Sequence, residues 1–119
     1  MVRFDPSSFL PLTSAMFQIL VALADGEKHG YAIIKEVERR TEGTVVLRTG
    51  TLYTALKRFV DDGLVEETAE RPDPALDDER RRYYRLTDNG RRVALAETDR
   101  LEATLAQARA KFGLKTRRS

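Results

Sequence analysis

The pattern that most constrains this chain lies near its C-terminus, where residues recur at alternating steps of four and three. They are Ala94, Thr98, Leu101, Leu105, Ala108 and Phe112. A repeat of about 3.5 residues is typical of a helix in a coiled-coil-like contact. At about 1.5 Å per residue, such a helix is longer than a three-helix core of ~60 residues can cover. The pattern therefore predicts packing on a second copy of the chain, and the alternative left open is packing on its own domain alone.

Three further helices are predicted upstream, over residues 14–24, about 29–43 and 49–63. Thr13 is placed to cap the first of these, and Thr87 to cap the C-terminal helix, because a threonine hydroxyl accepts hydrogen bonds from the free N–H groups of a first helical turn. In the third, apolar side chains recur at the spacing of one helical face. They are Leu52, Ala55, Leu56, Phe59 and Val60. Gly63 then follows as an ordinary C-terminal stop.

The face of the third helix opposite this apolar stripe is polar, aromatic and basic. It displays Gly50, Tyr53, Thr54 and Lys57, with Arg58 beside them. Because no acidic residue interrupts it before Asp61, we interpret it as a candidate reading surface. Structural alternatives stand beside this interpretation. Tyr53 could brace its helix against the first or second helix, and the cations could simply be solvated.

Two short strands are predicted before the last helix, over residues 64–68 and 81–86. Tyr83 and Tyr84 supply residues that favour strands in the second. Residues 69–80 contain two Pro and three Asp, a composition typical of turns. The expected fold class is therefore mainly α with a small β-hairpin. A winged helix-turn-helix with an N-terminal arm would occupy residues 1–87, and a long dimerisation helix with a basic tail would occupy residues 88–119.

Charge is distributed unevenly along the chain although the net charge is only +2. Residues 64–79 carry seven acidic groups and one basic group, whereas residues 80–92 carry six Arg and one Asp. Blocks of opposite sign create strong local fields even where their sum is small. The segment Arg80–Arg82 is accordingly a candidate for phosphate contacts. Its alternative is internal pairing with Glu66, Glu67 and Asp77–Glu79.

Composition excludes several classes of function. The chain has no Cys and one His, which removes disulfides, thiol catalysis, cysteine-ligated zinc and a multi-histidine metal site within one chain. His29 precedes Gly30 at a predicted helix start, where a structural role is favoured. No Ser or Lys stands beside an evident base, so we expect neither an enzyme nor a bound cofactor. The chain also lacks an apolar run long enough for a membrane span and a signal peptide, and we expect a soluble, cytoplasmic protein of one domain.

Several short motifs, in order over about residues 10–92, resemble those of the PadR family of bacterial transcriptional regulators, in its short subfamily with one C-terminal helix. The first are Leu12-Thr13 with Phe17-Gln18-Ile19-Leu20, and His29-Gly30-Tyr31-Ala32-Ile33. The more specific ones are Gly50-Thr51-Leu52-Tyr53-Thr54-Ala55-Leu56 with Asp62-Gly63-Leu64-Val65, and Arg82-Tyr83-Tyr84-Arg85-Leu86-Thr87 with Gly90. Each motif is weak by itself, and their order and spacing together are specific.

The resemblance implies a homodimer whose third helices enter successive major grooves while the wings approach the flanking DNA backbone. Gly50, Thr51, Tyr53 and Lys57 match the recognition-helix segment. Tyr31 and Lys35 fall on the preceding helix, where they could touch phosphate, and Arg82 matches the base of the wing. The chain departs from the family at Pro72–Glu79, which is acidic where a basic or neutral wing tip is expected. Arg80, Arg81 and Arg82 would then have to supply the wing's phosphate contacts.

The function expected is that of a sequence-specific regulator of transcription, a repressor by resemblance, whose partners are double-stranded DNA and a second copy of itself. Phosphate contacts would hold the dimer on the duplex, while side chains of the third helix face base edges. The latter are Thr49, Thr51, Tyr53, Thr54 and Lys57. The resemblance also allows a small apolar or phenolic effector, which the residues do not assign. The alternative is a winged-helix module that binds another protein through the acidic wing or the C-terminal apolar pattern, without specific DNA binding.

Overall fold

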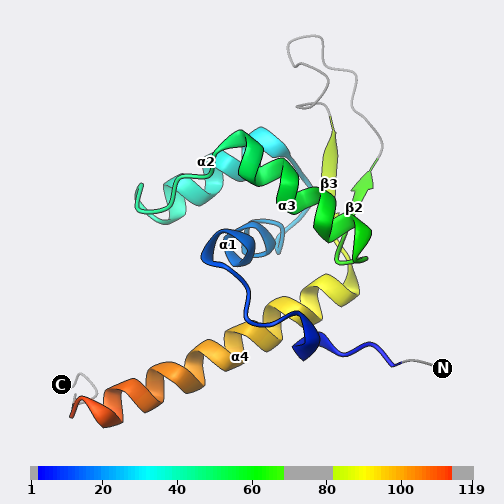
Figure 1. The fold of residues 1–119 in the computed structure, drawn as a ribbon. Helices are drawn as coiled ribbons and strands as arrows, with labels where there is room; N and C mark the ends of the chain where they lie inside the picture. The colour runs from blue at the N-terminus through cyan, green and yellow to red at the C-terminus, as the bar shows by residue number, and fades with distance from the viewer. Residues whose placement is uncertain (1–2, 69–81, 114–119) are drawn as a thin grey trace.

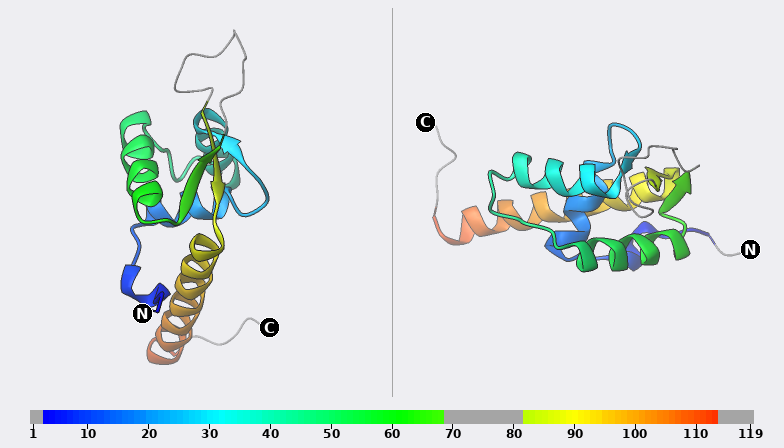
Figure 2. Two further views of the ribbon diagram at one scale, coloured as in Figure 1. Left: turned by 90° about the vertical axis from the view of Figure 1, so that its right-hand side faces the viewer. Right: turned by 90° about the horizontal axis from the view of Figure 1, so that it is seen from above.

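A computed structural model describes residues 3–68 and 82–113 of the chain (Figure 1). Its elements, in order, are η1 (Pro6–Phe9), α1 (Ser14–Ala22), β1 (Lys28–His29), α2 (Gly30–Arg40), α3 (Thr49–Asp61), β2 (Val65–Thr68), β3 (Tyr83–Leu86) and α4 (Asp88–Lys111). Helices α1, α2 and α3 and the sheet form the body of the molecule, and α4 runs out from beneath it (Figures 1 and 2). The predicted elements are therefore all present.

Side chains cap three of the helices at their N-termini. Thr13 Oγ1 accepts a hydrogen bond from the Met16 N–H at 3.1 Å, and Thr87 Oγ1 accepts one from the Gly90 N–H at 3.0 Å. His29 Nδ1 accepts from the Ala32 N–H at 3.2 Å. The predicted caps at Thr13 and Thr87 are confirmed, and His29 has the structural role that its position favours.

Helices α1, α2 and α3 end two or three residues earlier than predicted, and the turn after α3 shows the reason for that helix. After α3, Gly63 has φ +77°, the Gly63 N–H donates to the Val60 carbonyl and the Leu64 N–H donates to the Phe59 carbonyl. This pattern is the Schellman motif, in which a residue in the left-handed conformation satisfies the last carbonyls of a helix. Gly63 is thus the turn residue, and the helix itself ends at Asp61.

The apolar stripe predicted on α3 forms the centre of the core. Leu52, Leu56 and Phe59 are buried, and they pack with buried residues of α1 and α2. Val60 is only partly buried, at the edge of this cluster. Burial of this stripe leaves the opposite face of α3 at the surface, as the periodicity predicts.

The sheet has three antiparallel strands in the order β1-β3-β2, one more than the predicted hairpin. Strands β2 and β3 pair with Val65 opposite Leu86 and Thr68 opposite Tyr83. The additional strand, β1, pairs Lys28 with Tyr84 on the other side of β3. Because β1 has two residues, it carries no alternation that sequence analysis could detect.

Helix α4 contacts the body only through its first half. Gly90 lies against the body so closely that a Cβ there would come within 2.0 Å of the Leu64 carbonyl oxygen, and Val93 and Glu97 are buried. The N-terminal segment with η1 lies along the same helix (Figures 1 and 2). Beyond it, the second half of α4 projects away from the body (Figure 1). None of the helices among residues 3–68 and 82–113 has the length and apolar character of a membrane span.

Candidate nucleic-acid interface

The outer face of α3 is a continuous exposed surface of small polar and basic residues. Thr49, Gly50, Thr51, Thr54, Lys57 and Arg58 are all exposed. These side chains come from one helix whose opposite face is held in the core, so their relative positions are fixed by the helix geometry. Such a face presents hydroxyl and cationic donors and little steric bulk. It can approach a surface that carries hydrogen-bond acceptors and negative charge.

Tyr53 belongs to the same face, but it is partly buried because its ring packs toward α2. A Cβ placed on Gly30, the first residue of α2, would lie 2.2 Å from the Tyr53 hydroxyl oxygen and 2.7 Å from the ring carbon that carries it. Tyr53 therefore contacts the start of α2, which is the bracing role that sequence analysis left open beside DNA contact.

A hollow of about 360 Å³ lies between the C-terminal half of α3 and the sheet. Its lining residues are Tyr53, Lys57, Val60, Asp61, Glu67, Arg82 and Tyr84. The hollow brings Lys57 of the third helix and Arg82 of the wing base to one surface, although 25 positions separate them in the sequence. Of these two cations, we expect Lys57 to face base edges and Arg82 to contact phosphate.

Both cations of this hollow have an acidic neighbour. Lys57 Nζ lies 3.7 Å from an Asp61 carboxylate oxygen, and Arg82 Nε lies 3.6 Å from a Glu67 carboxylate oxygen. All four side chains are substantially exposed, and ion pairs of this kind contribute about 0–1 kcal/mol. The pairs are weak enough for a phosphate to displace the acid.

The other glutamate of β2 has a different partner from the one considered in the sequence analysis. Glu66 pairs with Arg85 of β3, directly across the strand pair, instead of with Arg82. Alternation along β2 places Glu66 and Glu67 on opposite faces of the sheet. Arg80, Arg81 and the acidic segment Asp77–Glu79 lie outside the described residues.

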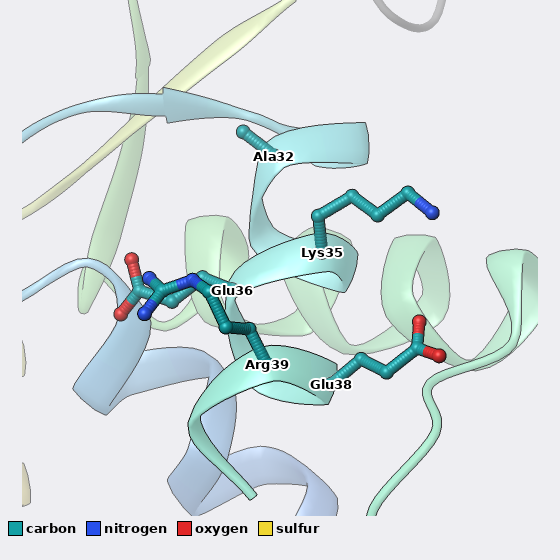
Figure 3. Close-up of a pocket in the computed structure, with 5 residues that line it drawn as sticks. All are labelled: Ala32, Lys35, Glu36, Glu38 and Arg39. Atoms are coloured by element: carbon teal, nitrogen blue, oxygen red, sulfur yellow. The ribbon is translucent and has the colours of Figure 1, made fainter. Parts of the chain in front are cut away.

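Tyr31 and Lys35, the α2 residues expected near phosphate, are both exposed and neighbour each other. Lys35 Nζ lies 5.3 Å from the centroid of the Tyr31 ring, within cation–π range. Lys35 also lines a shallow surface pocket with other α2 residues. There, Lys35 and Glu38 point to one side of the helix, and Glu36 and Arg39 point to the other (Figure 3). The charged groups of this pocket therefore lie in two pairs on opposite sides of the helix (Figure 3).

No cluster of three or more His, Cys, Asp or Glu side chains suited to a metal ion occurs in the described parts of the chain. The ring of His29, besides capping α2, meets the ring of Tyr83 edge-on at 5.4 Å between centroids. This imidazole is therefore engaged by the backbone of α2 and by β3.

The C-terminal pattern divides into two parts on α4. Ala94 packs against the protein's own core, and Thr98 and Leu101 are partly buried. Leu105 and Phe112 are 56% and 77% exposed. The first turns of α4 thus use the chain's own domain, and the last turns present uncovered apolar side chains.

Sequence analysis missed the residues that α4 does bury. Gly90, Val93 and Glu97 stand at steps of three and four along the helix, beside the predicted pattern. Their spacing is a usable signal, but a glutamate and a glycine within it hide the stripe from a search for apolar residues. Glu97 is 1% exposed, and its carboxylate accepts hydrogen bonds from Arg100 and from the Leu12 N–H.

Comparison with known proteins places this fold and its motifs in one family. Residues 19–96 match the model of the transcriptional regulator PadR-like family. No curated protein sequence matches the chain.

Solved structures of regulators share the fold. A transcriptional regulator from Clostridium thermocellum is 24% identical, with a TM-score of 0.67, over 86% of this chain and 92% of that one. H. salinarum RosR is 32% identical, with a TM-score of 0.60, over 83% of this chain and 79% of that one. Bacillus subtilis PadR, in complex with operator DNA, is 24% identical, with a TM-score of 0.61, over 76% of this chain and 48% of that one. Because residues 19–96 make up more than half of the 119-residue chain, the match to the family model shows that the chain belongs to the PadR-like family of transcriptional regulators.

Proposed function

We propose that this regulator binds DNA sequence-specifically as a homodimer and represses transcription from an inverted-repeat operator. The observation that carries the proposal is the exposed face of α3, which lacks acidic residues from Thr49 to Val60. The likeness to Bacillus subtilis PadR, whose structure includes operator DNA, supports it.

In this proposal α3 enters the major groove, and basic residues of α2, α3 and the wing contact the DNA backbone. Thr49, Thr51, Thr54 and Lys57 face base edges, Tyr53 lies between them on the same helix, and Gly50 lets the helix approach closely. Tyr31, Lys35, Arg58 and the wing residues Arg80, Arg81 and Arg82 contact or attract phosphate. Such phosphate contacts supply affinity and register, whereas contacts to base edges supply specificity.

The C-terminal half of α4 joins the two copies. Residues 88–119 act as the dimerisation segment, and residues 1–87 form the DNA-binding domain. Leu105 and Phe112 are exposed in the single chain, and a second copy would cover them. A two-fold dimer presents two identical α3 helices, so its operator is an inverted repeat. We also propose that the protein responds to a small apolar or phenolic effector, as the family resemblance implies.

Selection of bound duplexes from a random pool tests the proposal and identifies the operator. We expect an enriched inverted repeat that the protein binds about 10³-fold or more tightly than random DNA of equal length. Lys57→Ala should weaken binding of that duplex, whereas Lys111→Ala, at the far end of α4, is the matched control and should not. A pool without any enriched sequence would contradict sequence-specific binding and favour a protein-binding module.

A further inference from the structure

The contact between Tyr53 and Gly30 joins the candidate reading helix to the helix before it. Gly30 is buried and adopts helical conformation, so its backbone does not require glycine. Space explains its presence, because a Cβ would lie 2.2 Å, 2.7 Å and 3.1 Å from three atoms at the end of the Tyr53 side chain.

We propose that Tyr53 is a positioning residue, whose ring seats on Gly30 and sets the spacing and angle of α3 against α2. The inference rests on the proposed function and assigns to Tyr53 a role different from reading a base. Thr54 follows Tyr53 directly, and Gly50 and Lys57 lie one turn before and after it. A displacement of Tyr53 that rotation of its side chain does not absorb would therefore move the exposed face of α3.

The start of α2 is also the point where the wing is held. Lys28 of β1 pairs with Tyr84 of β3, and the His29 ring meets the Tyr83 ring at 5.4 Å. Residues 28–30 thus contact both β3 and α3 within three consecutive positions. Helix α3 and strand β3 are therefore both held by one short segment of the chain.

The two roles of Tyr53 predict different results for removal of its hydroxyl group. A hydroxyl that reads a base edge is absent in Tyr53→Phe, and the preference for the operator would fall with it. A ring that positions α3 is retained in Tyr53→Phe, and the preference would stay. Tyr53→Ala removes both and does not distinguish them by itself.

The decisive experiment is a double-mutant cycle of Gly30→Ala with Tyr53→Ala, together with Tyr53→Phe. For each folded protein, the affinities for the selected operator and for a random duplex are measured at one salt concentration. We expect Gly30→Ala to lower the ratio of operator affinity to random-duplex affinity about tenfold. We expect this effect although residue 30 lies beneath Tyr53, away from the exposed face of α3. In the Tyr53→Ala background, the same change should have almost no effect because the clash is gone. Tyr53→Phe should keep the wild-type ratio within about twofold.

Thermal unfolding of the same proteins provides the second measurement, which does not depend on DNA. Gly30→Ala should lower the midpoint in the wild-type background and not in the Tyr53→Ala background. Gly50→Ala is the stability control, because a Cβ there meets none of the described atoms within 4 Å. Additive effects in both cycles, or a Tyr53→Phe ratio as low as that of Tyr53→Ala, would overturn the positioning role. A wild-type protein without any preference for a duplex would instead overturn the proposed function, and the unfolding cycle would still test the contact.

Discussion

The Glu97 carboxylate accepts a hydrogen bond at 2.9 Å from the backbone N–H of Leu12, a residue 85 positions earlier in the chain. Arg100 donates to the same carboxylate, at 2.5 Å from Nε and 3.0 Å from Nη2. These donors satisfy a side chain that is 1% exposed, and Arg100 holds the pKa of Glu97 below its ordinary value. One buried glutamate thus ties the N-terminal segment to α4, beside the helix half that we propose as the dimer contact.

Removal of the Glu97 carboxylate should destabilise the fold. Glu97→Ala leaves the Leu12 N–H and Arg100 without their partner and opens a cavity, and we expect the free energy of unfolding to fall by about 2–4 kcal/mol. Glu102→Ala, on an exposed part of the same helix, is the matched control and should change it by less than about 0.5 kcal/mol. Urea unfolding of the two variants measures the difference. Equal stabilities would show that the buried carboxylate of Glu97 contributes nothing.

The lowered pKa of Glu97 predicts that the stability of the fold depends on pH. The pKa of Glu97 is lowered in the folded protein, so its ionised form stabilises the fold above the ordinary value of 4.5, and this contribution disappears as the pH falls through the lower folded value. The wild type should therefore lose stability below about pH 4.5 more steeply than Glu97→Gln. The pKa of Asp25, beside Lys28, is also lowered, but both proteins share this effect and it cancels in the comparison. Parallel pH profiles of the two proteins would contradict the assignment.

The dimer contact is tested on α4. Leu101→Asp combined with Leu105→Asp would bury two charges in the proposed contact, at a cost of about 3 kcal/mol or more, and should give a monomer. Leu95→Asp is the matched control, because Leu95 is 58% exposed and lies outside the 3.5-residue pattern. Analytical ultracentrifugation reports both outcomes. A wild type that sediments as a monomer at micromolar concentration would refute the contact itself.

The wing base is tested through the salt dependence of DNA binding. Arg82→Ala should weaken binding of operator and random duplex nearly equally. It should also reduce the slope of log affinity against log salt by about 0.9 for each phosphate that the variant no longer neutralises, and by about twice that in a dimer. An unchanged slope and affinity would remove Arg82 from the binding mechanism.

Glu67 should weaken the contribution of Arg82 to DNA binding in the same measurement. Glu67→Gln removes the acid 3.6 Å from the Arg82 guanidinium and should strengthen binding of random DNA. If the pairing with Arg82 is responsible, this gain should shrink in the Arg82→Ala background, whereas simple repulsion from phosphate would leave it unchanged. Glu66→Gln is a matched control, since Glu66 is the neighbouring glutamate of β2 and pairs with Arg85 on the other face of the sheet. Its effect should not depend on Arg82.

Local patterns predicted the elements well, because each depends on residues close in the sequence. The caps at Thr13 and Thr87 and the apolar stripe of α3 follow from hydroxyl placement and a period of 3.6 residues. The two longer strands follow from residue type around a turn-rich segment. The family motifs joined these elements into one fold.

Contacts between distant residues were beyond the reach of local patterns. Strand β1 exists because Lys28 pairs with Tyr84, and two residues have no periodicity of their own. Gly30 is explained only by the Tyr53 ring above it, 23 positions later. Glu97 occupies a core position that its charge argues against, and its burial depends on Leu12 and Arg100. In each case the cause is a partner that only the folded chain brings near.

Footprinting on the selected duplex tests most directly the central claim, that two copies present two α3 helices to DNA. We expect protection of two half-sites related by a dyad, with centres about one helical turn, ~10 bp, or twice that distance apart. Lys57→Ala should weaken both half-sites together, because each copy contributes the same helix. Protection of one asymmetric half-site by the wild type would contradict the account.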